Sequence, residues 1–284
     1  MARPLRIEFP GAVYHLSSWC EPGVPAFADD EDRAAFLALL AQTLHRFDAQ
    51  LLSYCLLPDH FHLLLFTRRG NLSQLMRHLL GVYTQQHHLR HGGCGTLFHG
   101  RFKAVLVDRE AHLLDTCRYI ELNPLRMGLV KDLAQWPWSS YPAHAGLVAV
   151  PEWLEADGLW AFVMGRALSG AADRRRAAER YAKLQASDSQ LRLWPGRLRQ
   201  QIFLGDDAFA RRMLAQGRRS RPAASAKAAP GQWADWLARS DSREQALYQA
   251  HTEGGMSMSV LAQTLGLSVS RVSRLVAAYE RGLG

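Results

Sequence analysis

Hydrophobic positions in the first half of the chain follow two periods, one helical and one strand-like. Apolar residues recur three or four positions apart over 30–47, 72–89 and 111–123, which predicts amphipathic helices. Short runs of β-forming residues predict strands at 13–20, 51–57, 61–66 and 104–107. The order β-α-β-β-α-β-α predicts an α+β fold class, a ferredoxin-like antiparallel sheet with helices on one face.

The pattern changes in the second half of the chain. Residues 148–220 are predicted to be helical and basic, without strand signals, and residues 221–231 have the Pro, Ala and Ser content of a linker. We therefore expect a first domain over 1–147, the basic helical region, the linker and a last domain over 232–284. On this division, a chain cut after residue 150 should keep the chemistry of the first domain.

The last domain carries the pattern of a helix-turn-helix. Helices are predicted over 259–265 and 269–281, joined by a tight turn in which Ser268 can cap the second helix. The apolar positions of the second helix share one face: Val272, Leu275, Val276 and Tyr279. The outward positions include Ser270, Arg271 and Arg274. The second helix is expected to contact duplex DNA in the major groove, and a plain αα-hairpin is the alternative.

The charge balance also favours a nucleic-acid partner. The formal net charge is +8, and residues 151–284 hold 20 Lys and Arg against 13 Asp and Glu. A basic face of this kind suits a polyanion, and a solvated helix surface is the alternative.

Composition also limits the compartment. No apolar run approaches the ~18 residues of a membrane span, and the first residues lack the apolar core of a signal peptide. We expect a cytoplasmic protein with no membrane partner. The cysteines are too far apart for a zinc ribbon and are expected to be buried, reduced thiols: Cys20, Cys55, Cys94 and Cys117.

Two histidines form the sharpest local feature. His60 and His62 lie two positions apart in a predicted strand, so their side chains should project from one face, with Phe61 on the other. Two neighbouring imidazoles are natural metal ligands. A pair of solvent-facing histidines is an equally good interpretation of this short motif alone.

A tyrosine and an amide share a face of the predicted helix 111–123. Tyr119 and Asn123 are four positions apart. If this helix crosses the sheet that bears the histidines, Asn123 can complete a three-ligand metal site beside the Tyr119 hydroxyl. A tyrosine hydroxyl next to a metal-polarised phosphodiester can attack phosphorus and form a phosphotyrosyl ester. Tyr83 is the rival nucleophile, and a half-buried structural aromatic is the alternative role for Tyr119.

Five blocks in order resemble a known family, over about residues 1–145. The blocks lie within Arg3–His15, Leu57–His62, Phe98–Ala104, Tyr119–Pro124 and Trp136–Tyr141. They are similar to the IS200-like single-tyrosine transposases with an HUH motif, specifically the REP-associated tyrosine transposase branch.

The resemblance implies a ferredoxin-like catalytic domain that cleaves single-stranded DNA beside a hairpin, with Mg²⁺ or Mn²⁺ and a 5′-phosphotyrosine intermediate. It implies that His60 and His62 are metal ligands, that Asn123 is the third ligand and that Tyr119 is the nucleophile. Arg101 and Lys103 match a basic block that is expected to contact phosphates.

Several alternatives stay open on the sequence. The protein could be a DNA-binding regulator with an inactive first domain, or a metal-dependent nuclease that uses water. It could be a monomer or a homodimer, with Tyr119 serving its own site or a partner's. Glycines beside a cluster of potential ligands favour a solvated loop over a zinc site: His87, His88, His91 and Cys94.

Overall fold

The computed structural model describes residues 7–21, 23–187, 191, 193–194, 196–220, 231–252, 254 and 256–281. The chain separates into two compact units, Met1–Ser220 and Arg221–Gly284. The expected linker 221–231 lies, except for its last residue, outside the described residues. Nowhere in the described part of the chain is a helix both long and apolar enough to cross a membrane.

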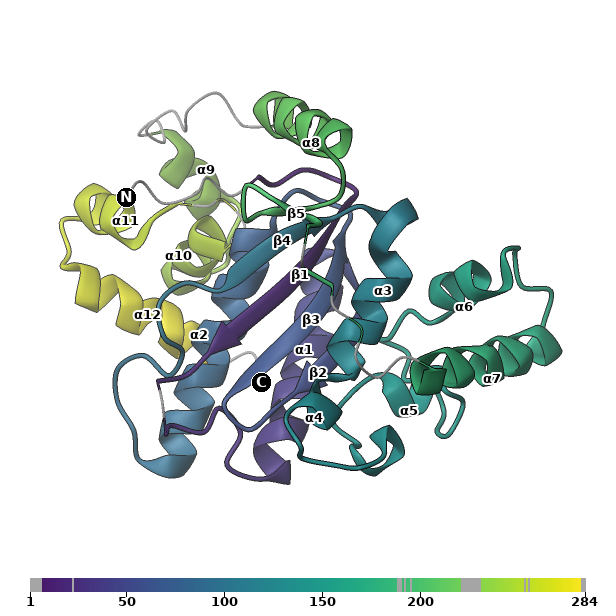
Figure 1. Cartoon of the computed structure of the whole chain (residues 1–284). Coiled ribbons are helices and arrows are strands. Elements are labelled where there is room, and N and C mark those ends of the chain that lie inside the picture. Colours follow the sequence, from purple (N-terminus) through teal and green to yellow (C-terminus); the bar gives the residue numbers. More distant parts are fainter. Residues whose placement is uncertain are drawn as a thin grey trace. The chain divides into compact units, whose positions relative to one another are not determined.

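The first unit is built on an open sheet whose strands alternate with helices along the chain (Figure 1). The elements that the sequence predicted run in chain order as β1 (Ala12–Trp19), α1 (Asp30–Phe47), β2 (Ala49–Leu56), β3 (His60–Thr67), α2 (Leu72–His91), β4 (Lys103–Val107) and α3 (Arg109–Glu121). The elements that follow are α4 (Asn123–Arg126), η1 (Leu133–Gln135), α5 (Tyr141–His144), α6 (Asp157–Met164), α7 (Ala171–Ser187), β5 (Leu198–Arg199), β6 (Phe203–Leu204) and α8 (Asp207–Ser220).

Strand order confirms the α+β prediction. Among the described residues the sheet has the order β2-β3-β1-β4-β6-β5. β3 lies between β2 and β1 and is antiparallel to both, which is the split βαβ arrangement of a ferredoxin-like sheet. β1 also pairs antiparallel with β4.

The second half of this unit differs from the prediction. β5 and β6 extend the sheet where only helices were expected, and β6 pairs parallel with β4, so the sheet is not wholly antiparallel. Two-residue strands carry too little alternation to be recognised in a sequence. Residues 148–220 therefore lie in the same compact unit as 1–147.

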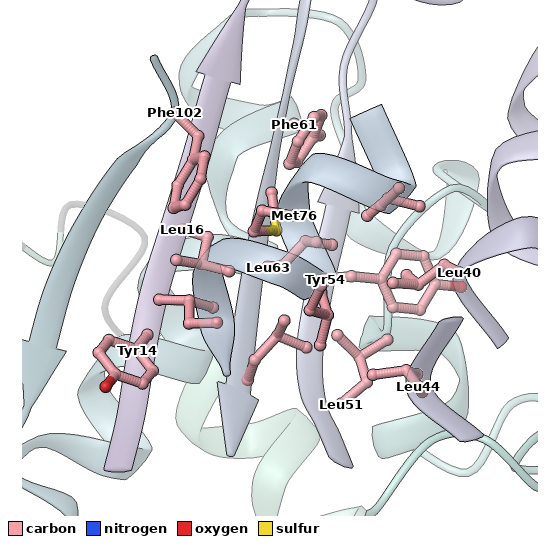
Figure 2. Packing of buried hydrophobic residues seen from close by; sticks show 14 of the residues in the cluster. Tyr14, Leu16, Leu40, Leu44, Leu51, Tyr54, Phe61, Leu63, Met76 and Phe102 are labelled. Carbon is pink, nitrogen blue, oxygen red and sulfur yellow. The ribbon is translucent and has the colours of Figure 1, made fainter. Parts of the chain in front are cut away.

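Helices cover both faces of the sheet, not one face as expected. On one face, Tyr14, Leu16, Phe61 and Leu63 pack against α1 and α2 in a large apolar cluster (Figure 2). On the other face, a second cluster joins residues of β1, β2 and β3 to α3, α6 and α7: it includes Val13, Cys55, Leu64, Cys117, Ile120, Leu159 and Tyr181. The strands are apolar on both sides at one end of the sheet, which is the pattern of a sheet covered twice.

Local signals explain where the helices begin and end. Asp29 caps α1 by accepting from the Asp32 amide at 3.0 Å, and Asp108 caps α3 in the same way. Gly92 ends α2 in a left-handed conformation with φ of 74°. Cys20, Cys55 and Cys117 are buried free thiols as predicted, whereas Cys94 is exposed.

The second unit is helical and has its own apolar core. Its helices are α9 (Gly231–Ala238), α10 (Arg243–Thr252), α11 (Met258–Leu265) and α12 (Val269–Arg281). Gly266 turns the chain after α11 with φ of 63°, and the Ser268 hydroxyl accepts from the Arg271 amide at 3.2 Å. Val272 and Val276 face the core as the spacing predicted.

Candidate functional site

His60 and His62 lie on β3, on the face of the sheet that α3 covers. Strand alternation puts Phe61 into the opposite core, so the two imidazoles project together. Their ring centroids are 5.1 Å apart. His60 and His62 are 8% and 5% exposed. They are therefore buried and do not form a solvent-facing pair.

A hydrogen bond fixes the far nitrogen of each imidazole. His60 Nδ1 lies 2.7 Å from the Asp59 carboxylate, and His62 Nδ1 lies 3.0 Å from His15 Nε2. When Nδ1 carries the proton and donates it, the lone pair is on Nε2. Carboxylate partners such as Asp59 commonly orient histidines that bind metals, and His15 fixes the Nδ1 of His62 by the same kind of contact.

Burial keeps the inner imidazoles neutral. It lowers the pKa of His62 well below its ordinary value, and the neighbouring histidines add to the effect. It lowers the pKa of His15 to about 3. A neutral ring can offer a lone pair to a metal ion, whereas a protonated ring cannot.

Tyr119 lies beside these rings, on α3. Its ring centroid is 6.3 Å from that of His62 and 6.1 Å from that of His15. Trp194 packs against it at 5.2 Å, and the Arg126 guanidinium lies 4.4 Å from the centre of the Tyr119 ring. The fold therefore brings together a histidine and a tyrosine that are far apart in the sequence.

Asn123 follows one turn later, with a difference from the predicted helix. α3 ends at Glu121, and Asn123 is the first residue of α4. Its amide nitrogen donates to the carbonyls of Tyr119 at 2.9 Å and Ile120 at 3.0 Å, which lie in the last turn of α3. With the nitrogen held in this way, Oδ1 is the end of the amide that can bind a cation.

A pocket of about 760 Å³ opens beside Tyr119 and His62, and His60 and Asn123 are not among the residues that line it. Tyr119, His62 and His15 line it from inside, and Arg101 and Lys103 line it from the segment that enters β4. The Lys103 ammonium lies 4.7 Å from the centre of the Trp19 ring. The pocket thus combines a tyrosine, imidazoles, aromatic faces and positive charge.

These residues lie in a segment that matches a family model, that of the IS200-like transposases, over residues 11–123. We call residues 11–123 the IS200-like domain, after the family whose model they match. The match includes His60, His62, Tyr119 and Asn123, and it ends at the last of them.

Comparison with whole proteins gives a likeness to a solved structure. No curated protein matches the chain. A solved structure of a REP-associated tyrosine transposase bound to a REP hairpin is 16% identical, with a TM-score of 0.46, and the match covers 56% of this chain and 93% of that one.

Tyr83, the rival nucleophile, is a core residue of the IS200-like domain. It is buried among Phe27, Phe36 and Phe98, and its hydroxyl donates to the Ala26 carbonyl at 2.6 Å. Burial raises its pKa far above the ordinary value for tyrosine. A phenol in this environment cannot reach a DNA phosphate.

Sequence reasoning missed several neighbours of Tyr119 and the two histidines. His15 and Trp19 alternate along β1 on the face that carries His60 and His62, a pattern visible in the sequence once β1 is placed next to β3. Trp194 and Arg126 reach Tyr119 from later segments, and no sequence signal links them to it.

The remaining predicted residues lie in the second unit. Ser270, Arg271 and Arg274 are exposed on α12, as the helical spacing predicted.

Proposed function

We propose that the IS200-like domain cleaves and rejoins single-stranded DNA through a phosphotyrosyl ester on Tyr119. The observation that carries the proposal is the position of the Tyr119 ring, 6.3 Å from His62 in a pocket lined with basic residues. A structural aromatic would need no such neighbours.

The residues around Tyr119 fit a divalent cation. His60 and His62 present Nε2, because Asp59 and His15 occupy their other nitrogens, and Asn123 presents Oδ1. We assign the metal site to these three residues, with Mg²⁺ or Mn²⁺ as the ion. The bound ion would polarise a phosphodiester and stabilise the charge that develops on it.

The protein's own groups carry the covalent steps. The Tyr119 oxygen attacks phosphorus and releases its proton, the new Tyr–O–P bond forms, and the bond to the 3′-oxygen breaks. The departing 3′-oxygen takes up one proton and becomes a free 3′-OH, so the step is balanced. Rejoining reverses this, because another 3′-OH attacks the same phosphorus and displaces the tyrosine. The number of phosphoester bonds does not change, so no external energy source is needed.

Positive groups at the pocket hold the strand. Arg101 and Lys103 line the pocket near Trp19 and would contact phosphates, while Trp19 offers a face for base stacking. A hairpin next to the cleaved strand is the substrate that the family resemblance favours, and a REP hairpin is bound in the solved structure that the chain resembles.

One chain holds both parts of the site. Because Tyr119 and His62 of the same chain lie side by side, we propose that the tyrosine acts in its own subunit. A mixture of Tyr119→Phe with His60→Ala/His62→Ala should then form no adduct, whereas exchange between subunits would restore it.

Duplex DNA is the partner that we propose for the second unit. α12 presents Ser270, Arg271 and Arg274 to solvent, in the position of a recognition helix. Arg271→Ala/Arg274→Ala should weaken duplex binding and lower its salt dependence by about one unit per lost phosphate contact. An unchanged salt dependence would leave α12 as one half of an αα-hairpin.

A denaturing gel tests the central proposal. Labelled single-stranded hairpins incubated with Mg²⁺ or Mn²⁺ should give a covalent protein–DNA band that disappears in Tyr119→Phe. Tyr83→Phe is the matched control and should keep the band, because the Tyr83 hydroxyl is used inside the core. Binding without an adduct under either metal would identify a DNA-binding regulator. Cleavage that survives Tyr119→Phe would identify a nuclease that uses water.

A further inference from the structure

A second group of metal-ligating side chains lies between α1 and α2, on the face of the sheet away from Tyr119. Asp32, His87 and His91 each bring one ligand atom to within 4.8 Å of the others. Within the part of the chain that the structure describes, this is the one such group of three or more histidine, cysteine or acidic residues.

His87 is the residue that calls for an explanation. It is 8% exposed, yet neither of its ring nitrogens has a hydrogen-bond partner. Buried polar side chains are nearly always hydrogen-bonded. The sequence placed this histidine in a solvated loop, but α2 continues to His91 and turns His87 inward.

The spacing of the other two residues suits a shared ion. His87 and His91 are one helical turn apart, with ring centroids 4.5 Å from each other. His91 Nε2 lies 3.0 Å from both carboxylate oxygens of Asp32, which is 3% exposed. Ligand atoms around tetrahedral Zn²⁺ are about 3.3 Å apart, given Zn–N bonds of ~2.0–2.1 Å. Small side-chain rotations would close the group around an ion.

The surroundings orient the carboxylate and attract a cation. Asp32 accepts from the Ala28 amide at 2.8 Å and from Arg90. Arg90 also pairs with Asp29 and Glu31, so one guanidinium faces three carboxylates. The excess negative charge favours a divalent ion, and the fixed hydrogen bonds act as the outer partners that metal ligands usually have.

We propose that Asp32, His87 and His91 bind Zn²⁺ and that the ion joins the first turn of α1 to the last turn of α2. The ion would replace the hydrogen bond between His91 and Asp32 and would give the buried His87 the partner that it lacks. Exposed His91 leaves the fourth position open to water. Two imidazoles and one carboxylate favour Zn²⁺ over Mg²⁺, which prefers oxygen ligands.

Zinc titration of the full chain tests the site apart from the Tyr119 pocket. The background variant is His60→Ala/His62→Ala, which removes the imidazoles of the other proposed site. Metal-free protein is titrated with Zn²⁺ by calorimetry, and the melting temperature is followed with and without the ion. The same titration is then run after adding His91→Gln, His87→Gln or Asp32→Asn to the background. His88→Gln is the matched control, since it changes the neighbouring histidine on the same helix and leaves the three ligands in place.

The background variant should bind one equivalent of Zn²⁺ at micromolar concentration and melt at a higher temperature when it is bound. His91 is exposed, so His91→Gln should not affect folding. Loss of a residue that only hydrogen-bonds a metal ligand weakens metal binding about 10–100-fold. Loss of the ligand His91 itself should weaken Zn²⁺ binding by more than that. His88→Gln should bind as the background does. Absence of zinc binding in the folded background variant, or equal binding after His91→Gln and Asp32→Asn, would overturn the proposal. The His91–Asp32 contact would then be a hydrogen-bonded pair without an ion.

Discussion

At the scale of single residues, the partner of each histidine decides what that histidine can do. His60 and His62 have the same side chain as His87, but they differ in their neighbours. Asp59 and His15 hold the Nδ1 atoms of the first two, whereas neither nitrogen of His87 has a partner. The motif in the sequence identifies the histidines, and the hydrogen bonds identify the nitrogen that is free to bind.

Asp59 provides a test at this scale. Asp59→Ala removes the carboxylate that orients His60, so the affinity of the His60–His62 site for Mn²⁺ should fall about 10–100-fold. Adduct formation on Tyr119 should recover at higher Mn²⁺ concentration. Asp59 is half exposed, so folding should not change. Asp30→Ala, at an exposed aspartate on α1, is the control. An unchanged Mn²⁺ requirement in Asp59→Ala would show that Asp59 does not orient the ligand.

At the scale of elements, a buried carboxylate holds α3 in place. Glu121 is fully buried two residues after Tyr119. It accepts from Ser140 at 2.5 Å, His144 at 2.6 Å and Tyr181 at 2.7 Å. These partners come from α5, α7 and the residue before α5, so one side chain ties the helix that carries the tyrosine to the later part of the unit.

Removal of the Glu121 carboxylate should lower the free energy of unfolding. Glu121→Ala leaves several buried donors without this acceptor, and each buried donor left unsatisfied costs about 1–3 kcal/mol. Urea unfolding should show this loss in the free energy of unfolding. Glu110→Ala, in the exposed first turn of α3, should change stability by less than about 0.5 kcal/mol. Equal stability of the two variants would contradict the role of Glu121.

At the scale of the whole molecule, several arginines of the second half form ion pairs within the chain. Arg166 pairs with Asp173, Arg174 with Asp157, and Arg199 with Asp207. Each pair leaves the net charge unchanged, but fewer arginines are unpaired than the count of 20 Lys and Arg indicates. The same segment supplies Trp194 to the Tyr119 ring and Tyr181 to Glu121.

Truncation separates these roles. A chain that ends at Ser220 keeps the whole first unit and should still form the Tyr119 adduct on a short hairpin, while its affinity for duplex DNA becomes lower and less dependent on salt. A chain that ends at residue 150 lacks β5, β6 and Trp194, so it should lose stability and adduct formation together. Adduct gels and thermal unfolding of the two chains measure the difference. Full activity of the chain that ends at residue 150 would show that the first domain works without residues 151–220, as the sequence predicted.

The sequence by itself determined the local features of this protein. Alternation in β3 predicts that His60 and His62 share a face, and helical spacing predicts the inward and outward sides of α12, because strand and helix periods depend on near neighbours in the chain. The first four strands and first three helices were predictable for the same reason.

Tertiary structure decided which distant residues meet. Pairing of β1 with β3 puts His15 next to His62, and packing of α3 on the sheet puts Tyr119 beside both. The partners of Glu121, the strands β5 and β6 and the inward turn of His87 also depend on contacts between remote segments. The periodicity of the sequence does not predict such contacts, because they form when whole elements pack together and bury their apolar faces.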